Sequence, residues 1–104
     1  MDSKRIVLIT GANTGLGYEI VKALSGSDKP YEILLGGRSI EKAQAAAESA
    51  RAEFPNSQSN IRPVQIDIQD DKSIDDLFNE VKGTYGKLDV LINNAGTVLP
   101  HLVW

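Results

Sequence analysis

Near its start the chain carries a stretch, Ile6–Gly17, that reads as a strand ending in a glycine-rich turn and opening a helix. Ile6–Thr10 are β-branched residues or leucine and do not alternate with polar residues, which is typical of a strand covered by helices on both faces. Gly11, Gly15 and Gly17 follow. Glycine permits the positive φ of a tight turn and a close approach of the backbone to a ligand. Because the free N–H groups and the positive dipole end of the helix face this turn, the stretch predicts an anion site, as for a phosphate.

The rest of the chain alternates helices and strands in the same way. Apolar spacing predicts helices from Leu16 to Ser25, from the N-cap Ser39 to Phe54, and from Asp70 to the closing glycines Gly83 and Gly86. Apolar runs predict strands at Ile6–Thr10, Tyr31–Gly37, Ile61–Ile68 and Leu88–Ile92. This alternation predicts right-handed crossovers. The fold class is therefore α/β, a partial Rossmann fold with a four-stranded parallel sheet in the order 3-2-1-4. The 104 residues suffice for one domain, 1–104.

In an open parallel sheet, ligands bind outside the carboxyl ends of the strands. A site that selects NAD usually carries an acid at the end of the second strand to bond the ribose 2′-hydroxyl, but this chain has Gly37 there, followed by Arg38. A guanidinium fits a 2′-phosphate, so the sequence favours NADP over NAD. Asp67, at the end of the third strand, is expected to bond the adenine amino group, with a loop or capping role as the alternative. Asn93 and Asn94 border the cofactor or form a plain turn.

Other classes of function fit the sequence poorly. A P-loop needs Lys and Ser or Thr after its last glycine, and Tyr18 and Glu19 stand there instead. A net charge of −3 gives no basic field for nucleic acid or an anionic membrane. No cysteine and the lone His101 exclude cysteine and histidine metal sites, and neither His101 nor Trp104 has partners for catalysis. With no signal peptide or membrane-spanning run, we expect a soluble, cytoplasmic protein.

Three motifs occur in order: Thr10-Gly11-x-x-x-Gly15-x-Gly17, Asp67, and Asn93-Asn94-Ala95-Gly96. Together they resemble the amino-terminal half of the short-chain dehydrogenases/reductases over about residues 5–98. The arginine after the second strand resembles the NADP-preferring branch, which includes carbonyl reductases and retinol dehydrogenase-like enzymes. The resemblance implies a cofactor set in which the glycine motif with Thr14 and Leu16 holds the pyrophosphate, Arg38 holds the 2′-phosphate, Asp67 and Ile68 border adenine, and Asn94, Ala95 and Gly96 line the adenosine ribose. Asn93 is expected to be structural.

The family's catalytic residues have no counterpart in this sequence. Members carry a further asparagine, a serine and a Tyr-x-x-x-Lys pair beyond the segment matched here, and Tyr18-x-x-x-Lys22 has that spacing only on the first helix. We therefore assign no catalytic residue. The resemblance implies hydride transfer between nicotinamide C4 and a carbonyl or alcohol carbon in a full-length form, with this chain inactive alone. The alternatives are a non-catalytic NADP(H)-binding or sensing module and a non-functional fragment.

The absence of a second half also bears on folding. Two helices should cover one face of the sheet and the third helix the other, which leaves that second face partly bare and the fourth strand as an edge. We therefore expect marginal stability or self-association.

Overall fold

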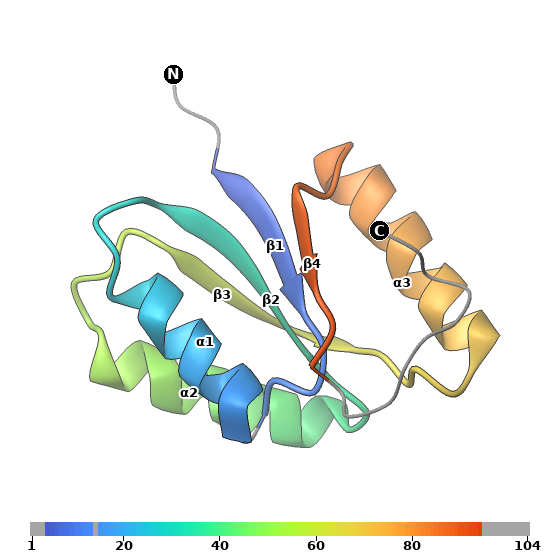
Figure 1. Cartoon of the computed structure of the whole chain (residues 1–104), viewed down its shortest axis with the longest axis horizontal. Helices are drawn as coiled ribbons and strands as arrows, with labels where there is room; N and C mark the ends of the chain where they lie inside the picture. The colour runs from blue at the N-terminus through green and yellow to red at the C-terminus, as the bar shows by residue number, and fades with distance from the viewer. Residues whose placement is uncertain (1–3, 14, 95–104) are drawn as a thin grey trace.

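The computed structural model describes residues 4–13 and 15–94. Strands and helices alternate along it (Figure 1): β1 Arg5–Ile9, α1 Gly15–Ser25, β2 Tyr31–Gly37, α2 Ile40–Glu53, β3 Asn60–Gln65, α3 Asp71–Tyr85 and β4 Val90–Ile92. All neighbouring strands are parallel, and their order is β3-β2-β1-β4. The α/β fold and the strand order predicted from the sequence are confirmed.

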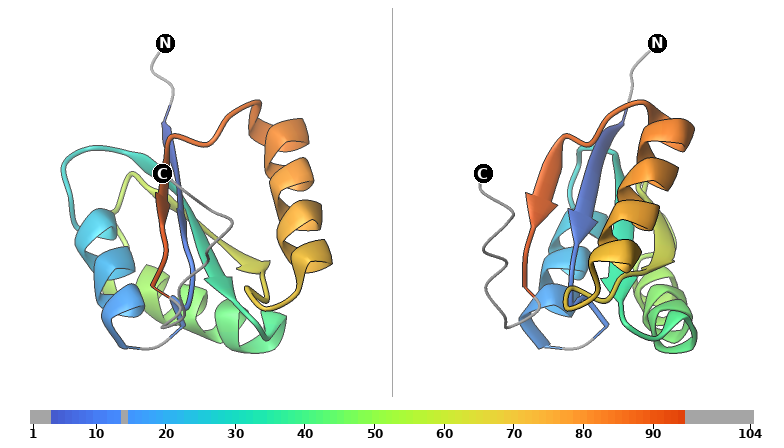
Figure 2. Two further views of the ribbon diagram at one scale, coloured as in Figure 1. Left: turned by 45° about the vertical axis from the view of Figure 1, so that its right-hand side comes forward. Right: turned by 90° about the vertical axis from the view of Figure 1, so that its right-hand side faces the viewer.

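The three helices pack on the two faces of the sheet, α1 and α2 on one face and α3 on the other (Figure 2). Successive residues of β1 point to opposite faces, so Val7 and Ile9 join the core with α1 and α2, whereas Ile6 and Leu8 join the core with α3. Four alanines of α2 are buried, which lets this helix pack close to the sheet: Ala43, Ala46, Ala47 and Ala50. The predicted distribution of helices over the two faces is therefore confirmed.

The helix ends follow the capping residues in the sequence, with one correction. Ser39 and Asp70 are N-caps, and their side chains accept hydrogen bonds from the backbone N–H of Lys42 and Lys72. At the other end of α3, Gly83 was expected to help close the helix, but the helix continues through it to Tyr85. Gly86 alone takes the left-handed conformation of a C-cap, with φ of 78°.

Two strands are shorter than their apolar runs predicted. β3 ends at Gln65 instead of Ile68 because β2 stops at Gly37, whose carbonyl accepts the last hydrogen bond from the N–H of Ile66 at 2.9 Å. β4 begins at Val90 instead of Leu88. Just before it, the Asp89 N–H donates to the carbonyl of Ile6 at 3.0 Å, while the Asp89 carboxylate accepts from the Ile6 N–H at 2.7 Å.

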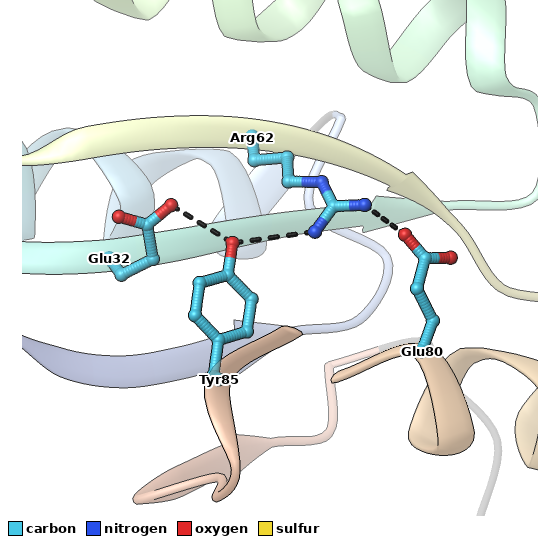
Figure 3. Close-up of polar contacts among 4 residues, drawn as sticks. All are labelled: Glu32, Arg62, Glu80 and Tyr85. Carbon is cyan, nitrogen blue, oxygen red and sulfur yellow. Dashed lines mark hydrogen bonds and ion pairs between the residues drawn. The ribbon is translucent and has the colours of Figure 1, made fainter. Parts of the chain in front are cut away.

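A network of hydrogen-bonded polar side chains crosses the α3 side of the sheet (Figure 3). The Tyr85 hydroxyl donates to Glu32 of β2 at 3.0 Å and accepts from Arg62 of β3 at 3.4 Å. Arg62 also pairs with Glu80 of α3. Burial is the main cause that raises the pKa of Tyr85. This network attaches the carboxyl-terminal half of α3 to β2 and β3, two strands that are distant from it in sequence.

Candidate nucleotide-binding site

The glycine turn joins β1 to α1 at the carboxyl edge of the sheet. Gly11 and Gly15 have φ of 59° and 63°, a conformation that favours glycine. The N–H of Ala12 donates to the carbonyl of Gly36 at 2.8 Å, so the turn is attached to the end of the neighbouring strand β2. The backbone of the turn is thus held over the edge where β1 and β2 end.

Gly17 lets α1 approach this turn closely. A Cβ on Gly17 would lie 2.6 Å from the carbonyl oxygen of Gly11, 2.7 Å from Asn94 Nδ2 and 2.9 Å from the Cα of Ala12. Two of these atoms belong to the backbone of the turn, which cannot move aside as a flexible side chain can. The residue is therefore required for close packing between the helix, the turn and the end of β4.

The two asparagines after β4 connect it to the end of β1. The hydroxyl of Thr10, which is 1% exposed, donates to Asn93 Oδ1 at 2.9 Å and accepts from the backbone N–H of Asn94 at 3.0 Å. The Asn94 side chain donates to the carbonyl of Gly11 at 3.5 Å. The Asn93 side chain thus joins the end of β4 to the end of β1, a contact of the structural kind that was expected for this residue. The hydroxyl of Thr10 was not predicted to join the two strands, although the residue lies in the recognised glycine motif.

A cavity of about 710 Å³ lies beside the turn, where residues from three strand-to-helix connections meet. Its lining consists of Gly11, Asn13, Arg38, Ser39, Lys42, Ile66, Asp67, Ile68 and Gln69. The structure therefore brings four of the predicted residues to one cavity, Gly11, Arg38, Asp67 and Ile68. Gly15, Leu16, Gly17 and Asn94 lie outside its lining, and the side chain of Leu16 is 67% exposed at the start of α1. The predicted residues Thr14, Ala95 and Gly96 lie outside the described residues, as do His101 and Trp104.

The cavity has one cationic side and one mixed side. Arg38 and Ser39 come from the connection between β2 and α2, and Lys42 comes from the first turn of α2. No carboxylate pairs with Arg38 or Lys42 in residues 4–13 and 15–94. On the other side, Asp67 Oδ1 accepts from the N–H of Gln69 at 3.0 Å. The carboxylate therefore makes a hydrogen bond within its own loop, and its second oxygen adds an acceptor beside Ile66 and Ile68 of the lining.

Sequence reasoning missed five lining residues: Asn13, Ser39 as a lining side chain, Lys42, Ile66 and Gln69. Lys42 carried a usable signal, because it follows Arg38 by four residues on the first turn of a helix that starts at the carboxyl edge. The others became neighbours only through the crossovers that place three connections side by side.

A second cavity, of about 610 Å³, runs between β3 and α3 and shares Arg38 and Asp67 with the first. Its other cations have partners, since Arg62 pairs with Glu80 and Lys72 pairs with Asp76 at 2.7 Å. It is therefore less suited to an anionic ligand than the cavity beside the glycine turn.

In the described part of the chain, no group of three or more His, Cys, Asp or Glu residues is placed to hold a metal ion. Nor does any helix within residues 4–13 and 15–94 have the length and apolar character needed to cross a bilayer.

Comparison with known proteins decides the family. The family model described as short chain dehydrogenase matches residues 5–102. The chain belongs to the short-chain dehydrogenase family. It is 48% identical over 101 residues to the short-chain dehydrogenase/reductase eupG of Phoma sp, covering 96% of this chain and 36% of that protein. It is 36% identical over 95 residues to mouse (Mus musculus) retinol dehydrogenase 12, covering 91% of this chain and 29% of that protein.

Solved structures of this family share the fold. The menthone neomenthol reductase of Mentha piperita superimposes with a TM-score of 0.82 at 32% identity, over 92% of this chain and 33% of that one. The L-sorbose reductase of Gluconobacter frateurii, solved in complex with NADPH and L-sorbose, gives a TM-score of 0.75 at 27% identity, over 91% of this chain and 34% of that one. This short-chain dehydrogenase segment spans about a third of the length of these relatives.

Proposed function

We propose that residues 1–104 form one domain that binds NADP(H), the cofactor-binding part of an oxidoreductase that acts on a carbonyl or alcohol substrate in a full-length form. One observation carries the cofactor preference: Arg38 lines the cavity at the carboxyl edge and has no carboxylate partner among residues 4–13 and 15–94, and it directly follows the strand whose last residue, Gly37, has no side chain. An acid at the end of that strand would favour the free 2′-hydroxyl of NAD, whereas a guanidinium favours a 2′-phosphate.

The remaining roles follow the path of a dinucleotide along this edge. We assign the pyrophosphate to the backbone at the start of α1, around Thr14, Gly15 and Leu16, where free N–H groups and the helix dipole attract anions. Gly11 and Gly17 keep that backbone open and close to the sheet. Adenine is assigned to Asp67 and Ile68, and the adenosine ribose to the segment Asn94–Gly96.

The family relationship supports a redox role for the bound cofactor. Nicotinamide C4 would exchange a hydride with the carbon of a carbonyl or alcohol, and the cofactor supplies this chemistry. No residue of this chain is assigned to the proton transfer that accompanies the hydride. We therefore expect this chain to bind NADPH without oxidising it in the presence of a carbonyl compound.

The test is direct binding of NADPH and NADH to the 104-residue chain, measured by titration calorimetry. We expect NADPH to bind at least about tenfold more tightly, because a charge-assisted pair with the phosphate is worth about 1.5–3 kcal/mol. Arg38→Met should remove most of this preference, while Arg5→Met, at the amino end of β1, should preserve it. Equal affinity of the native chain for both nucleotides would refute the cofactor assignment.

A further inference from the structure

Asp67 lies at the point where the sheet stops holding the chain after β3. The last hydrogen bond between this segment and β2 runs from the Ile66 N–H to the carbonyl of Gly37 at 2.9 Å, and β2 ends there. The next N–H, that of Asp67, donates instead to the hydroxyl oxygen of Ser73 at 2.9 Å, in a partly buried contact. A partly buried backbone N–H needs a partner, and Ser73 supplies it from the first turn of α3.

Two further hydrogen bonds shape the loop around Asp67. Its carbonyl accepts from the N–H of Asp70 at 3.0 Å, and Oδ1 of its carboxylate accepts from the N–H of Gln69 at 3.0 Å. Both partners lie in the loop or at the helix cap, so these bonds do not tie Asp67 to another element of the fold. Of the three bonds, only the one from the Asp67 N–H reaches a residue inside α3.

Ser73 lies behind Asp67 as seen from the cavity beside the glycine turn. Asp67, Ile68 and Gln69 line that cavity, whereas Ser73 lines only the second cavity, between β3 and α3, which Asp67 also borders. A ligand in the first cavity therefore meets Asp67 and not Ser73. Any effect of the Ser73 hydroxyl on such a ligand has to act through Asp67.

We propose that Ser73 is a positioning residue, which holds Asp67 so that its carboxylate recognises the amino group of the adenine base. The inference rests on the proposed function, in which adenine lies beside Asp67 and Ile68, and it deepens that function by assigning how the base is selected. A carboxylate only accepts hydrogen bonds. It therefore favours a purine whose amino group donates over a purine with an oxo group at the same place, which also accepts. Without the bond to Ser73, the backbone of Asp67 is released and its carboxylate is no longer held toward that donor.

The experiment compares two nucleotides that differ in this group. NADP⁺ carries adenine, and its hypoxanthine analogue carries an oxo group in place of the amino group. Their dissociation constants are measured by titration calorimetry for the native 104-residue chain and for the variants Ser73→Ala, Ser73→Thr and Ser59→Ala. We expect the native chain to bind NADP⁺ at least about tenfold more tightly, because only the amino group forms a hydrogen bond with the charged acceptor.

Ser59 provides a matched control at the opposite edge of the sheet. Its hydroxyl oxygen accepts from the N–H of Tyr31 at 2.9 Å, a partly buried bond of the same kind and length, and it lines neither cavity. We expect Ser73→Ala to reduce the preference for NADP⁺ to less than about threefold, and Ser59→Ala to leave it within about twofold of the native value. Ser73→Thr keeps a hydroxyl and should also stay within about twofold of the native value.

The fold of Ser73→Ala is protected by a second substitution if the single variant does not fold. A Cβ on Gly83 of α3 would meet no atom within 4 Å, and alanine is the better helix former. The same nucleotide preference is then measured in the Gly83→Ala background, with Gly83→Ala alone as the reference.

Each other result overturns a stated claim. A preference that Ser73→Ala leaves unchanged, that Ser59→Ala lowers equally, or that Ser73→Thr loses as fully as Ser73→Ala would show that the Ser73 hydroxyl does not position Asp67, although the proposed function would stand. Equal native affinity for the two nucleotides would overturn the inference together with the adenine contact of Asp67, while binding of NADP⁺ would remain. A native chain that binds neither nucleotide would overturn the proposed function itself.

Discussion

The same substitution, glycine to alanine, should have opposite effects in α1 and α3. Gly17 and Gly83 both lie inside helices. A Cβ on Gly83 would meet no atom within 4 Å, whereas a Cβ on Gly17 would lie 2.6–2.9 Å from three atoms. Helix propensity alone predicts that alanine stabilises both positions. The tertiary contacts predict that only Gly83→Ala is stabilising.

The magnitudes follow from these contacts. At Gly83 the gain is the propensity difference, about 0.5–1 kcal/mol in the free energy of unfolding. At Gly17 the added methyl group forces shifts of the Gly11 carbonyl and the Asn94 amide. Overpacking of this kind costs typically 1–3 kcal/mol, which exceeds the propensity gain. One kcal/mol corresponds to a change of about 4–8 °C in Tm for a domain of this size.

The assay is urea and thermal unfolding followed by far-UV circular dichroism for the native chain, both single variants and the double variant. We expect Gly83→Ala to melt above the native chain and Gly17→Ala to melt below it. If Gly17→Ala does not fold, it is measured in the Gly83→Ala background, because the two sites lie on opposite faces of the sheet and their effects should add. A Gly17→Ala variant as stable as the native chain would refute the argument from close packing.

Two further predictions concern titrating side chains. Tyr85→Phe removes the hydroxyl between Glu32 and Arg62 and should lower the free energy of unfolding by about 0.5–1.5 kcal/mol at pH 7. Because the folded pKa of Tyr85 is raised, this stabilisation is complete below the ordinary tyrosine value near 10 and is lost as pH rises through the folded pKa. Asp89→Asn should lower stability at pH 7, because the Ile6 N–H is the main cause that lowers the pKa of the Asp89 carboxyl. That advantage of the native chain is present above the ordinary value near 3.9 and is lost as pH falls through the folded pKa.

Both predictions are checked by urea unfolding across pH, with the native chain as the reference. A difference between the native chain and Tyr85→Phe that persisted unchanged at strongly alkaline pH would contradict the first. The second fails if the native chain and Asp89→Asn lose stability in parallel on acidification below about pH 4.

Local patterns in the sequence were sufficient for the order of elements and for several of their ends. An apolar run or a helical spacing of apolar residues is a property of one segment of the sequence. These patterns therefore predicted four strands, three helices and the distribution of the helices over the two faces of the sheet. Ser39 was recognised as a cap because a cap bonds to its own helix within three residues, and Asp70, which was expected to start the next helix, is its N-cap. Gly83 was misassigned, because only the left-handed φ of Gly86 marks the end of α3.

The tertiary structure alone decided which side chains meet across the chain. On α1 the fully buried stripe is Gly17, Val21 and Ser25, while the larger apolar residues Ile20 and Leu24 are only partly buried against the same core. The stripe follows from the close approach of the helix to Gly11 and Asn94.

The candidate site shows the same division. The sequence by itself determined a strand, a glycine turn and a helix start, together with the polar residues that end the neighbouring strands. It did not place Tyr85 between Glu32 and Arg62. These contacts depend on the register of parallel strands and on the paths of the crossovers, which bring together residues up to 53 positions apart. No local pattern in the sequence encodes a contact between residues so far apart, so these contacts are determined only in the folded chain.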